Sequence, residues 1–331
     1  MRALLAVASL SMLATCAEQA DPQDPLLERA PFSPIVVGHG SGTIVLVDLN
    51  RDGHLDLVTQ HLLDSLVNVF LGDGKGHFVG ATGSPMKLGY QPGTIALGDV
   101  NNDSILDLGI ANKDSRGEYV DILLGDGSGA FKRSLGSPFR ASAAMDFYKP
   151  ILRLVDVNAD GNIDIVTANG RRPTVEVMLG NGSGGFAAAS VLPVGAGPGI
   201  GSFAIGDVDG DGHLDLVVSN SGGPDLDRPG SLVIKRGDGK GHFTDASHSP
   251  LSAPPGAILE TLADVNGDGR LDAVIRYGER NVVNVFANEG KGVFGSAPAA
   301  RIQVEADAFA VRVEDLNRDK IADLIVATVQ S

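Results

Sequence analysis

Asp207-Val-Asp-Gly-Asp-Gly-His-Leu-Asp215 is the most acidic copy of a nine-residue pattern that decides the fold. The pattern has Asp at its first, fifth and ninth positions and Asp or Asn at its third. It occurs six times, with copies that start at Asp48, Asp99, Asp156, Asp207, Asp264 and Asp315. Successive copies lie 51 or 57 residues apart. A regular period of this length predicts a repeat protein in which each copy belongs to one supersecondary unit.

Short apolar runs flank each copy and predict strands. Thr43–Val47 precedes the first copy and Leu55–Val58 follows it, and both are rich in Val, Ile or Leu but too short for helices. A further strand and a Gly-rich hairpin turn follow in five repeats, as in Val67–Phe78. In four repeats a proline follows seven residues after the hairpin phenylalanine, at Pro85, Pro138, Pro193 and Pro250. Proline cannot donate to a ladder, so it marks an edge strand.

Four short strands in each repeat predict an all-β fold, a β-propeller of four-stranded blades. No segment shows a sustained helical period, which excludes helical solenoids, and the repeat is longer than a rung of a parallel β-helix. Six repeats predict six blades. The last repeat ends at Ser331, after its second strand, and residues 27–37 resemble an outer strand that would close this incomplete blade. Seven blades remain the alternative.

The acidic loops have the ligand chemistry of a calcium site. Ca²⁺ takes six to eight hard oxygens, and alternate residues of a tight loop can supply them. The predicted side-chain ligands, one set for each loop, are Asp48, Asn50, Asp52, Asp56; Asp99, Asn101, Asp103, Asp107; Asp156, Asn158, Asp160, Asp164; Asp207, Asp209, Asp211, Asp215; Asp264, Asn266, Asp268, Asp272; and Asp315, Asn317, Asp319, Asp323. The carbonyl at the seventh position adds His54, Ile105, Asn162, His213, Arg270 and Ile321. We therefore expect up to six Ca²⁺ ions.

An EF-hand and a simple polar turn are the two other interpretations of these loops, and the sequence favours neither. An EF-hand needs a bidentate Glu at position twelve and flanking helices, whereas position twelve is never acidic here and the flanks are predicted strands. Polar turns alone would explain one loop, but 19 carboxylates in 24 ligand positions would repel one another without a cation. Gly at position six permits the required positive φ. Ser104 and Lys320 depart from it and predict weaker sites, whereas the fourth loop should bind most tightly.

These loops between strands, together with Gly-Asp-Gly-x-Gly-x-Phe hairpins, resemble the FG-GAP and VCBS repeats of integrin-α-type propellers. The resemblance covers residues 27–331. It implies that each loop joins the first and second strands of a blade. It also implies Ca²⁺ on one face of the propeller and ligand binding on the opposite face.

Charge and the N-terminal segment indicate where the protein acts. The 331 residues include 41 acidic and 26 basic ones, a formal charge of -15 that argues against nucleic-acid binding. Residues 1–16 predict a signal peptide whose Leu13-Ala14-Thr15-Cys16 end resembles a bacterial lipobox, with Cys16 as the lipidated residue. Ordinary cleavage near Ala17 is the alternative. Residues 17–26 predict a linker. Either interpretation exports the protein, as an envelope or cell-surface lipoprotein or as a secreted protein, with a lipid anchor as its one contact with membrane.

A recognition role is the preferred functional prediction. The loops opposite the acidic ones carry basic and aromatic residues. These residues predict a binding face for an anionic glycan or a protein partner. Ordinary solvated loop charges would explain the same residues about as well. These residues are Tyr90, Arg116, Tyr148, Arg171, Arg172, Arg228, Arg276 and Tyr277. The alternative is a polysaccharide-active enzyme, a lyase or hydrolase, which a non-repeated cluster of His, Tyr or acidic residues in the funnel would favour. We expect a monomer.

Overall fold

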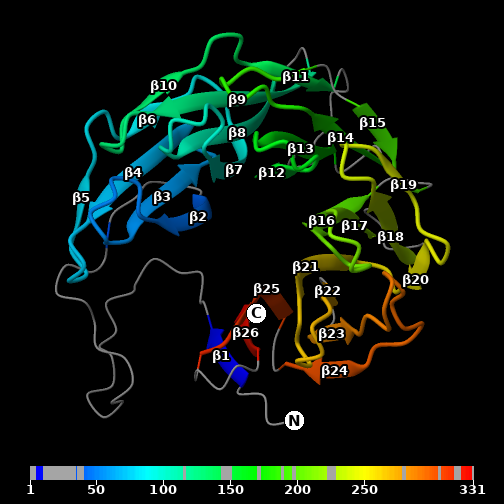
Figure 1. The fold of residues 1–331 in the computed structure, drawn as a ribbon. Helices are drawn as coiled ribbons and strands as arrows, with labels where there is room; N and C mark the ends of the chain where they lie inside the picture. Colours follow the sequence, from blue (N-terminus) through cyan, green and yellow to red (C-terminus); the bar gives the residue numbers. More distant parts are fainter. Residues whose placement is uncertain are drawn as a thin grey trace, which may run out of the picture.

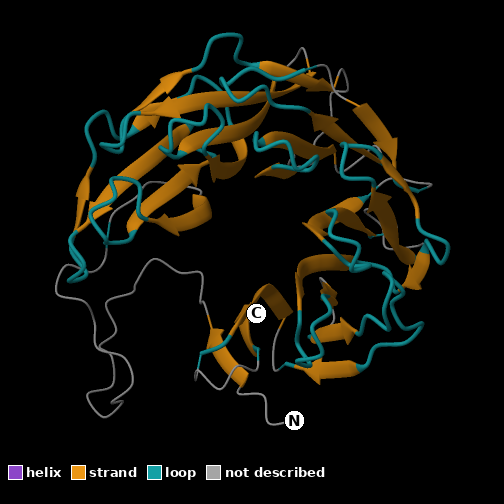
Figure 2. Ribbon diagram, in the orientation of Figure 1, coloured by secondary structure: helices purple, strands orange, loops and turns teal. Residues whose placement is uncertain are grey.

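A computed structural model of the chain describes residues 5–9, 35, 41–114, 117–142, 151–169, 173–187, 190–195, 199–221, 229–277, 281–304, 307–316 and 322–329. These residues form strands and connecting loops and contain no helix (Figure 2). The all-β prediction is therefore confirmed. Accordingly, no helix in the described ranges is long and apolar enough to cross a membrane.

Five sheets share one topology, in which consecutive antiparallel strands run from an inner to an outer edge around a common centre (Figure 1). They are blades one to five of a β-propeller. Their strands are β2 (Ser41–Val47), β3 (Asp56–His61), β4 (Leu66–Gly72), β5 (Phe78–Gly80) and β6 (Met86–Lys87); β7 (Pro92–Gly98), β8 (Asp107–Asp114), β9 (Gly117–Gly125), β10 (Phe131–Arg133) and β11 (Phe139–Ser142); β12 (Ile151–Val155), β13 (Asp164–Asn169), β14 (Thr174–Met178) and β15 (Ser190–Pro193); β16 (Ile200–Gly206), β17 (Asp215–Asn220), β18 (Gly230–Gly237), β19 (Phe243–Asp245) and β20 (Leu251–Ala253); and β21 (Ala257–Ala263), β22 (Asp272–Tyr277), β23 (Val282–Phe286) and β24 (Ala300–Gln303).

The outer strand of blades one, two and four is split into two pieces that both pair with the third strand. A Ser-Pro pair lies at each break, and the serine Oγ accepts a hydrogen bond from a backbone N–H of the third strand at 2.9 Å. These serines are Ser84, Ser137 and Ser249. The proline follows immediately, which agrees with the predicted position of proline at the outer edge.

The last sheet is incomplete. It contains β25 (Asp307–Glu314), β26 (Asp323–Val329) and β1 (Leu5–Ser9), and β1 pairs in parallel with β26. Five blades are thus complete in the described residues, and neither six nor seven blades is confirmed. Of residues 27–37, which were predicted to close this sheet, only residue 35 is described. The third position, for which the sequence predicted no strand, is taken by β1, because an open strand edge is a template for an extended chain.

Apolar side chains form a core between each pair of neighbouring sheets. Val58, Val67 and Val69 of blade one, for example, pack with Ile95 and Ile110 of blade two. Four further clusters in the described residues join successive sheets in the same way, and one of them joins blade five to the last sheet. Successive side chains of a strand point to opposite faces of the sheet, and apolar cores cover these faces. A one-residue shift would move every side chain to the other face, so this burial fixes the strand register.

A buried polar network shows how the second blade is held. Asp121, which is 1% exposed, accepts hydrogen bonds from Tyr90, from Ser137 Oγ at 2.8 Å and from Arg133 Nη2 at 3.1 Å. The Ser137 hydroxyl also accepts from the Ile122 N–H. Removal of the Ser137 hydroxyl would leave the Ile122 N–H and one Asp121 oxygen without this hydrogen-bond partner.

We predict that Ser137→Ala lowers the free energy of unfolding by about 1–3 kcal/mol. The matched control is Ser128→Ala, which removes an exposed turn hydroxyl bonded to Asp126 and should cost at most about 0.5 kcal/mol. Urea denaturation measures both. Equal losses in the two variants would contradict the assigned role of Ser137.

Candidate metal centre

Each acidic loop joins the first and second strands of its sheet, as between β2 and β3 or between β16 and β17. This connection is the one that the sequence resemblance implied. Loops of neighbouring blades also approach one another, since Asn102 Nδ2 donates to Asn162 Oδ1 at 2.8 Å. The second and third acidic loops therefore lie side by side.

Within a loop, the carboxylates are aimed by backbone N–H groups. In the first loop Asp48 Oδ1 and Oδ2 accept from the N–H groups of Asp52 and Gly53 at 3.2 and 3.0 Å. Asn50 Oδ1 accepts from Asp52 N–H at 3.1 Å, and Asp52 Oδ1 accepts from His54 N–H at 2.9 Å. The same bonds recur in loops two to five. The side chains at positions one, three and five thus hold the turn of each loop through the same set of hydrogen bonds.

Two positions of each of loops one to five adopt positive φ. Position six does so as predicted, with φ of 85° at Gly53 and 88° at Gly212. Ser104 takes the same conformation, at 68°, which costs a side chain more than it costs glycine. Position four was not anticipated, and Arg51 and Ala159 lie there at 59° and 57°. Because positive φ is unfavourable for such residues, the side-chain hydrogen bonds of the loop must hold the backbone in place.

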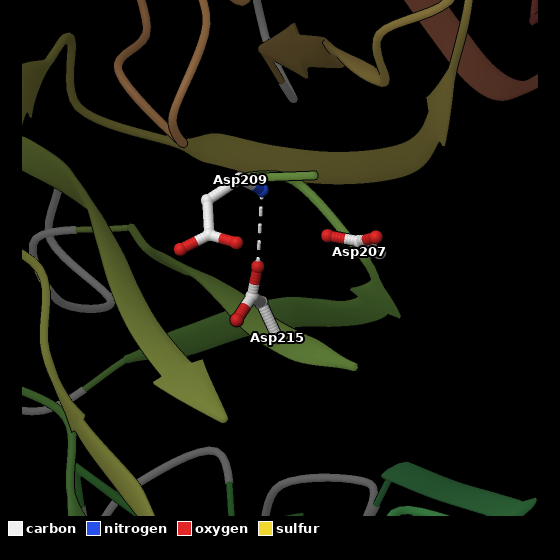
Figure 3. Close-up of side chains that lie close together, drawn as sticks. All are labelled: Asp207, Asp209 and Asp215. Atoms are coloured by element: carbon white, nitrogen blue, oxygen red, sulfur yellow. Dashed lines mark hydrogen bonds between the residues drawn. The ribbon is translucent and has the colours of Figure 1, made fainter. Parts of the chain in front are cut away.

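The aspartate at position nine is buried in every copy, at 0 to 2% exposed. One oxygen accepts from the N–H at position two of its loop, and in the five blades the other accepts from the end of the third strand. In blade four Asp215 Oδ2 accepts from Val208 N–H and Oδ1 accepts from Gly237 N–H, both at 2.9 Å. Asp215 Oδ2 also accepts from the Asp209 N–H at 3.2 Å (Figure 3). This one carboxylate therefore ties a loop to two strands, and its Oδ1 accepts a single bond and keeps a second lone pair.

Burial raises the pKa of the position-nine carboxyl in loops two to five. The pKa of Asp107 rises to about 6, mainly through burial, although the N–H groups of Gly125 and Val100 lower it. The pKa values of Asp164, Asp215 and Asp272 are raised for the same reason. Nearby loop aspartates add to the rise, so a cation that neutralised them would favour the ionised form.

The fourth loop gathers the densest group of carboxylates. One oxygen each from Asp207, Asp209 and Asp215 lie within 4.8 Å of one another (Figure 3). Two oxygens bound to the same Ca²⁺ at about 2.3 to 2.6 Å are at most about 5 Å apart, so this spacing fits a shared ion. In loops one, two, three and five Asn replaces the second of these carboxylates. Asp211 instead directs Oδ1 at the His213 N–H, at 2.8 Å.

Two arginines contact carboxylates of these loops. The sequence pattern did not identify either of them as a competitor for a cation. Arg236 Nε lies 3.2 Å from Asp209 Oδ2, and this aspartate side chain is 7% exposed. Arg270 Nη2 lies 2.5 Å from Asp268 Oδ2 in loop five. A cation in either loop would therefore compete with a guanidinium for one carboxylate.

The remaining predicted ligands fall into two groups. Loops one to five are described throughout, and in the sixth loop Asp315 and Asp323 are described while Asn317, Asp319 and Ile321 lie outside the described residues. Leu316 N–H donates to Asp323 Oδ2 at 3.0 Å, as in the other loops. Cys16 and the linker also lie outside them.

The predicted ligand face is only partly described. Arg116, Tyr148, Arg171, Arg172 and Arg228 lie outside the described residues.

The other three predicted face residues make internal contacts. Tyr277 is 3% exposed within the core between blades four and five, so it offers almost no surface to a ligand. Tyr90 donates to Asp121, and burial together with this bond raises the pKa of its phenol. Arg276 pairs with Glu260.

Residues 48–110, 156–218 and 264–326 match the family model described as the FG-GAP-like repeat, and together they make up more than half of the chain. The chain belongs to this family. Each matched segment begins at one acidic loop and ends in the strand that follows the next acidic loop. Curated proteins provide no match.

Solved structures share the fold at low sequence identity. A lectin from Agrocybe aegerita, described as recognising non-reducing terminal N-acetylglucosamine, is 20% identical, with a TM-score of 0.54 over 81% of this chain and 67% of its own. BBS1N in complex with ARL6DN is 13% identical, with a TM-score of 0.56 over 87% and 77%. An α-L-arabinofuranosidase from Fusarium graminearum is 10% identical, with a TM-score of 0.52 over 88% and 89%. At these identities the three likenesses show that the FG-GAP protein shares the fold of these structures.

We predict that Asp215→Ala lowers the free energy of unfolding by about 2–5 kcal/mol in EDTA, because the buried N–H groups of Val208 and Gly237 lose their acceptor. Urea denaturation in EDTA excludes any contribution from bound cation.

The control is Asp126→Ala, whose exposed carboxylate accepts hydrogen bonds within a hairpin turn that water can replace. It should cost less than about 1 kcal/mol. A loss below that value for Asp215→Ala would contradict a structural role for position nine.

Proposed function

We propose that this protein is an exported, calcium-stabilised β-propeller that recognises a glycan or a protein partner at the cell envelope. The observation that carries the proposal is the repeated acidic loop, in whose fourth copy Asp207, Asp209 and Asp215 are spaced for one hard cation. Repetition in successive blades favours a structural role for the ion, since an ion bound only by the folded chain stabilises that state.

The ions proposed here number up to six, one in each loop. The fourth loop would bind most tightly, because it offers four carboxylates. Loop two, with Ser104 at position six, and loop six, with Lys320 there, would bind more weakly. Loop five would also be weakened, since Arg270 already pairs with Asp268. Arg236 pairs with Asp209 in loop four, but three further carboxylates remain there.

Calcium stoichiometry tests this proposal. Equilibrium dialysis of the wild-type chain against Ca²⁺ should give several bound ions, and the Asp207→Ala/Asp209→Ala double variant should bind one fewer. Asp126→Ala, which changes a carboxylate outside the loops, should bind the wild-type number. A double variant that retains the wild-type stoichiometry would count against the loop as a site.

The proposed architecture and location extend beyond the described residues. Because β1 lies within the proposed signal peptide, cleavage would remove it, and the sheet of β25 and β26 would then be a sixth blade that residues 27–37 complete. Its packing against blade five through Val311 and Val326 supports this view. Residues 1–16 would act as a signal peptide, with Cys16 lipidated at the envelope, so that the propeller lies outside the cytoplasm.

Recognition is supported by two fold neighbours that bind partners, a lectin and BBS1N with ARL6DN. A second candidate, a polysaccharide-active enzyme, is favoured by Glu260, an acidic residue at a position that is apolar in the other five repeats. An arabinofuranosidase among the fold neighbours agrees with it. However, Arg276 and the Val311 N–H occupy both carboxylate oxygens of Glu260, which does not suit proton transfer.

A glycan array, with and without chelator, tests recognition. We predict calcium-dependent binding that falls at least about tenfold in an Arg171→Ala/Arg172→Ala variant, as expected when charge-assisted hydrogen bonds are lost. Arg301→Ala, which changes an exposed arginine on the outer strand β24, is the control and should bind normally. Unchanged binding in the double variant would reject this face, and turnover of a bound polysaccharide would favour the enzyme.

A further inference from the structure

The inner strands that face the centre of the propeller carry arginines at one repeat position. Three residues before the first aspartate of the loop, blades one, two, four and five have Val45, Ala96, Ala204 and Thr261. Blade three and the last sheet have Arg153, on β12, and Arg312, on β25. Both strands border the central opening in Figure 1. The other four repeats form their sheets with an uncharged residue at this position. The blade fold itself therefore does not need the arginine.

The two arginines lack a counterion within the described residues. Arg153 Nη1 donates to the Leu152 carbonyl at 2.9 Å, and its guanidinium lies 5.5 Å from the centre of the Phe203 ring. Arg312 Nη1 makes the equivalent bond to the Val311 carbonyl at 3.0 Å. Each guanidinium has five N–H donors, so most of them remain available.

The nearby carboxylate does not neutralise them. Glu260 is already paired with Arg276 and accepts from the Val311 N–H at 3.4 Å. Arg153 and Arg312 thus add two positive charges at the centre of a chain whose net charge is -15. Burial lowers the pKa of Arg153, and the like charge of Arg312 lowers it further. Arg153 is half-buried and Arg312 is exposed, and an anion between the two like charges would stabilise both.

A cavity of about 290 Å³ adjoins Arg153, near the lower end of the usual size of ligand pockets. Residues of β12, β16 and β21 line it, and apart from Arg153 and Glu260 its walls are mostly apolar, with Val155, Ile205 and Leu262 among them. An anion with a carbon body suits these walls. A bare phosphate dianion suits them less, because it would leave the apolar surface uncovered and lie beside Glu260.

We propose that Arg153 and Arg312 form a site in the central channel for the carboxylate of a small organic anion, such as a uronic acid. The planar guanidinium forks match the two carboxylate oxygens, and the apolar walls cover the carbon body. The site gives the ligand class for the proposed recognition role and rests on that role, but it uses residues other than Arg171 and Arg172 of the predicted loop face.

Isothermal titration calorimetry of the full chain in calcium-containing buffer at low ionic strength tests the proposal. The ligands are D-galacturonate, neutral D-galactose, propionate and inorganic phosphate. Galacturonate should bind and galactose should not. Propionate that binds as tightly as galacturonate identifies a free organic acid as the ligand, and weaker propionate binding identifies the sugar acid; both results support a carboxylate site. Equal binding of galactose, tighter binding of phosphate, or no carboxylate binding would overturn it.

Arg153→Met and Arg312→Met should each weaken galacturonate binding at least about tenfold, the loss expected for one charge-assisted contact. Arg301→Met is the control and should bind as the wild type does. Unaltered binding in both channel variants would overturn the assignment. Thermal denaturation checks that they fold, and the comparison of galacturonate with galactose needs no variant.

Failure of this site is distinguishable from failure of the proposed function. If the channel binds no carboxylate while glycan or partner binding still depends on calcium and on Arg171 and Arg172, only the channel proposal fails. If the channel variants lose galacturonate while the loop variant retains it, the channel site stands by itself.

Discussion

The buried carboxylate at position nine of each acidic loop is the constraint on which the rest of the structure depends. In blade four Asp215 accepts two N–H groups from its own loop and another from the end of the third strand. Because burial raises the pKa of this carboxyl and of its counterparts in loops two, three and five, their charge is costly unless donors or a cation surround it. The repeat therefore couples the strand geometry of a blade to the chemistry of its loop.

The fourth loop, in turn, holds oxygens of Asp207 and Asp209 close to that carboxylate. Position one accepts from the N–H groups of positions five and six, which requires the backbone to turn with positive φ. Ser104 shows that a residue other than glycine tolerates this turn, at a conformational cost. A cation in the loops of adjacent blades would neutralise carboxylates that otherwise repel one another, and so would stiffen the sheets they join.

Spacing alone predicted the all-β fold and the residues of the loops, because the period of the aspartates is strict. It could not predict contacts between residues distant in sequence. Tyr277 looks like a surface residue in the sequence but is buried between blades, and Arg236 meets Asp209 only after β18 pairs with β17. Arg153 and Arg312 could have been found by aligning the repeats, where both replace smaller uncharged residues. That β12 and β25, which carry them, both border the centre of the propeller required the fold.

Differential scanning calorimetry in EDTA and in millimolar calcium chloride tests the central claim most directly. If the acidic loops hold cations that only the folded propeller binds, the melting temperature must be higher in calcium and must rise with its concentration. Magnesium chloride at equal ionic strength should stabilise less, since Mg²⁺ demands stricter octahedral geometry. The same melting temperature in EDTA and in calcium would contradict the account.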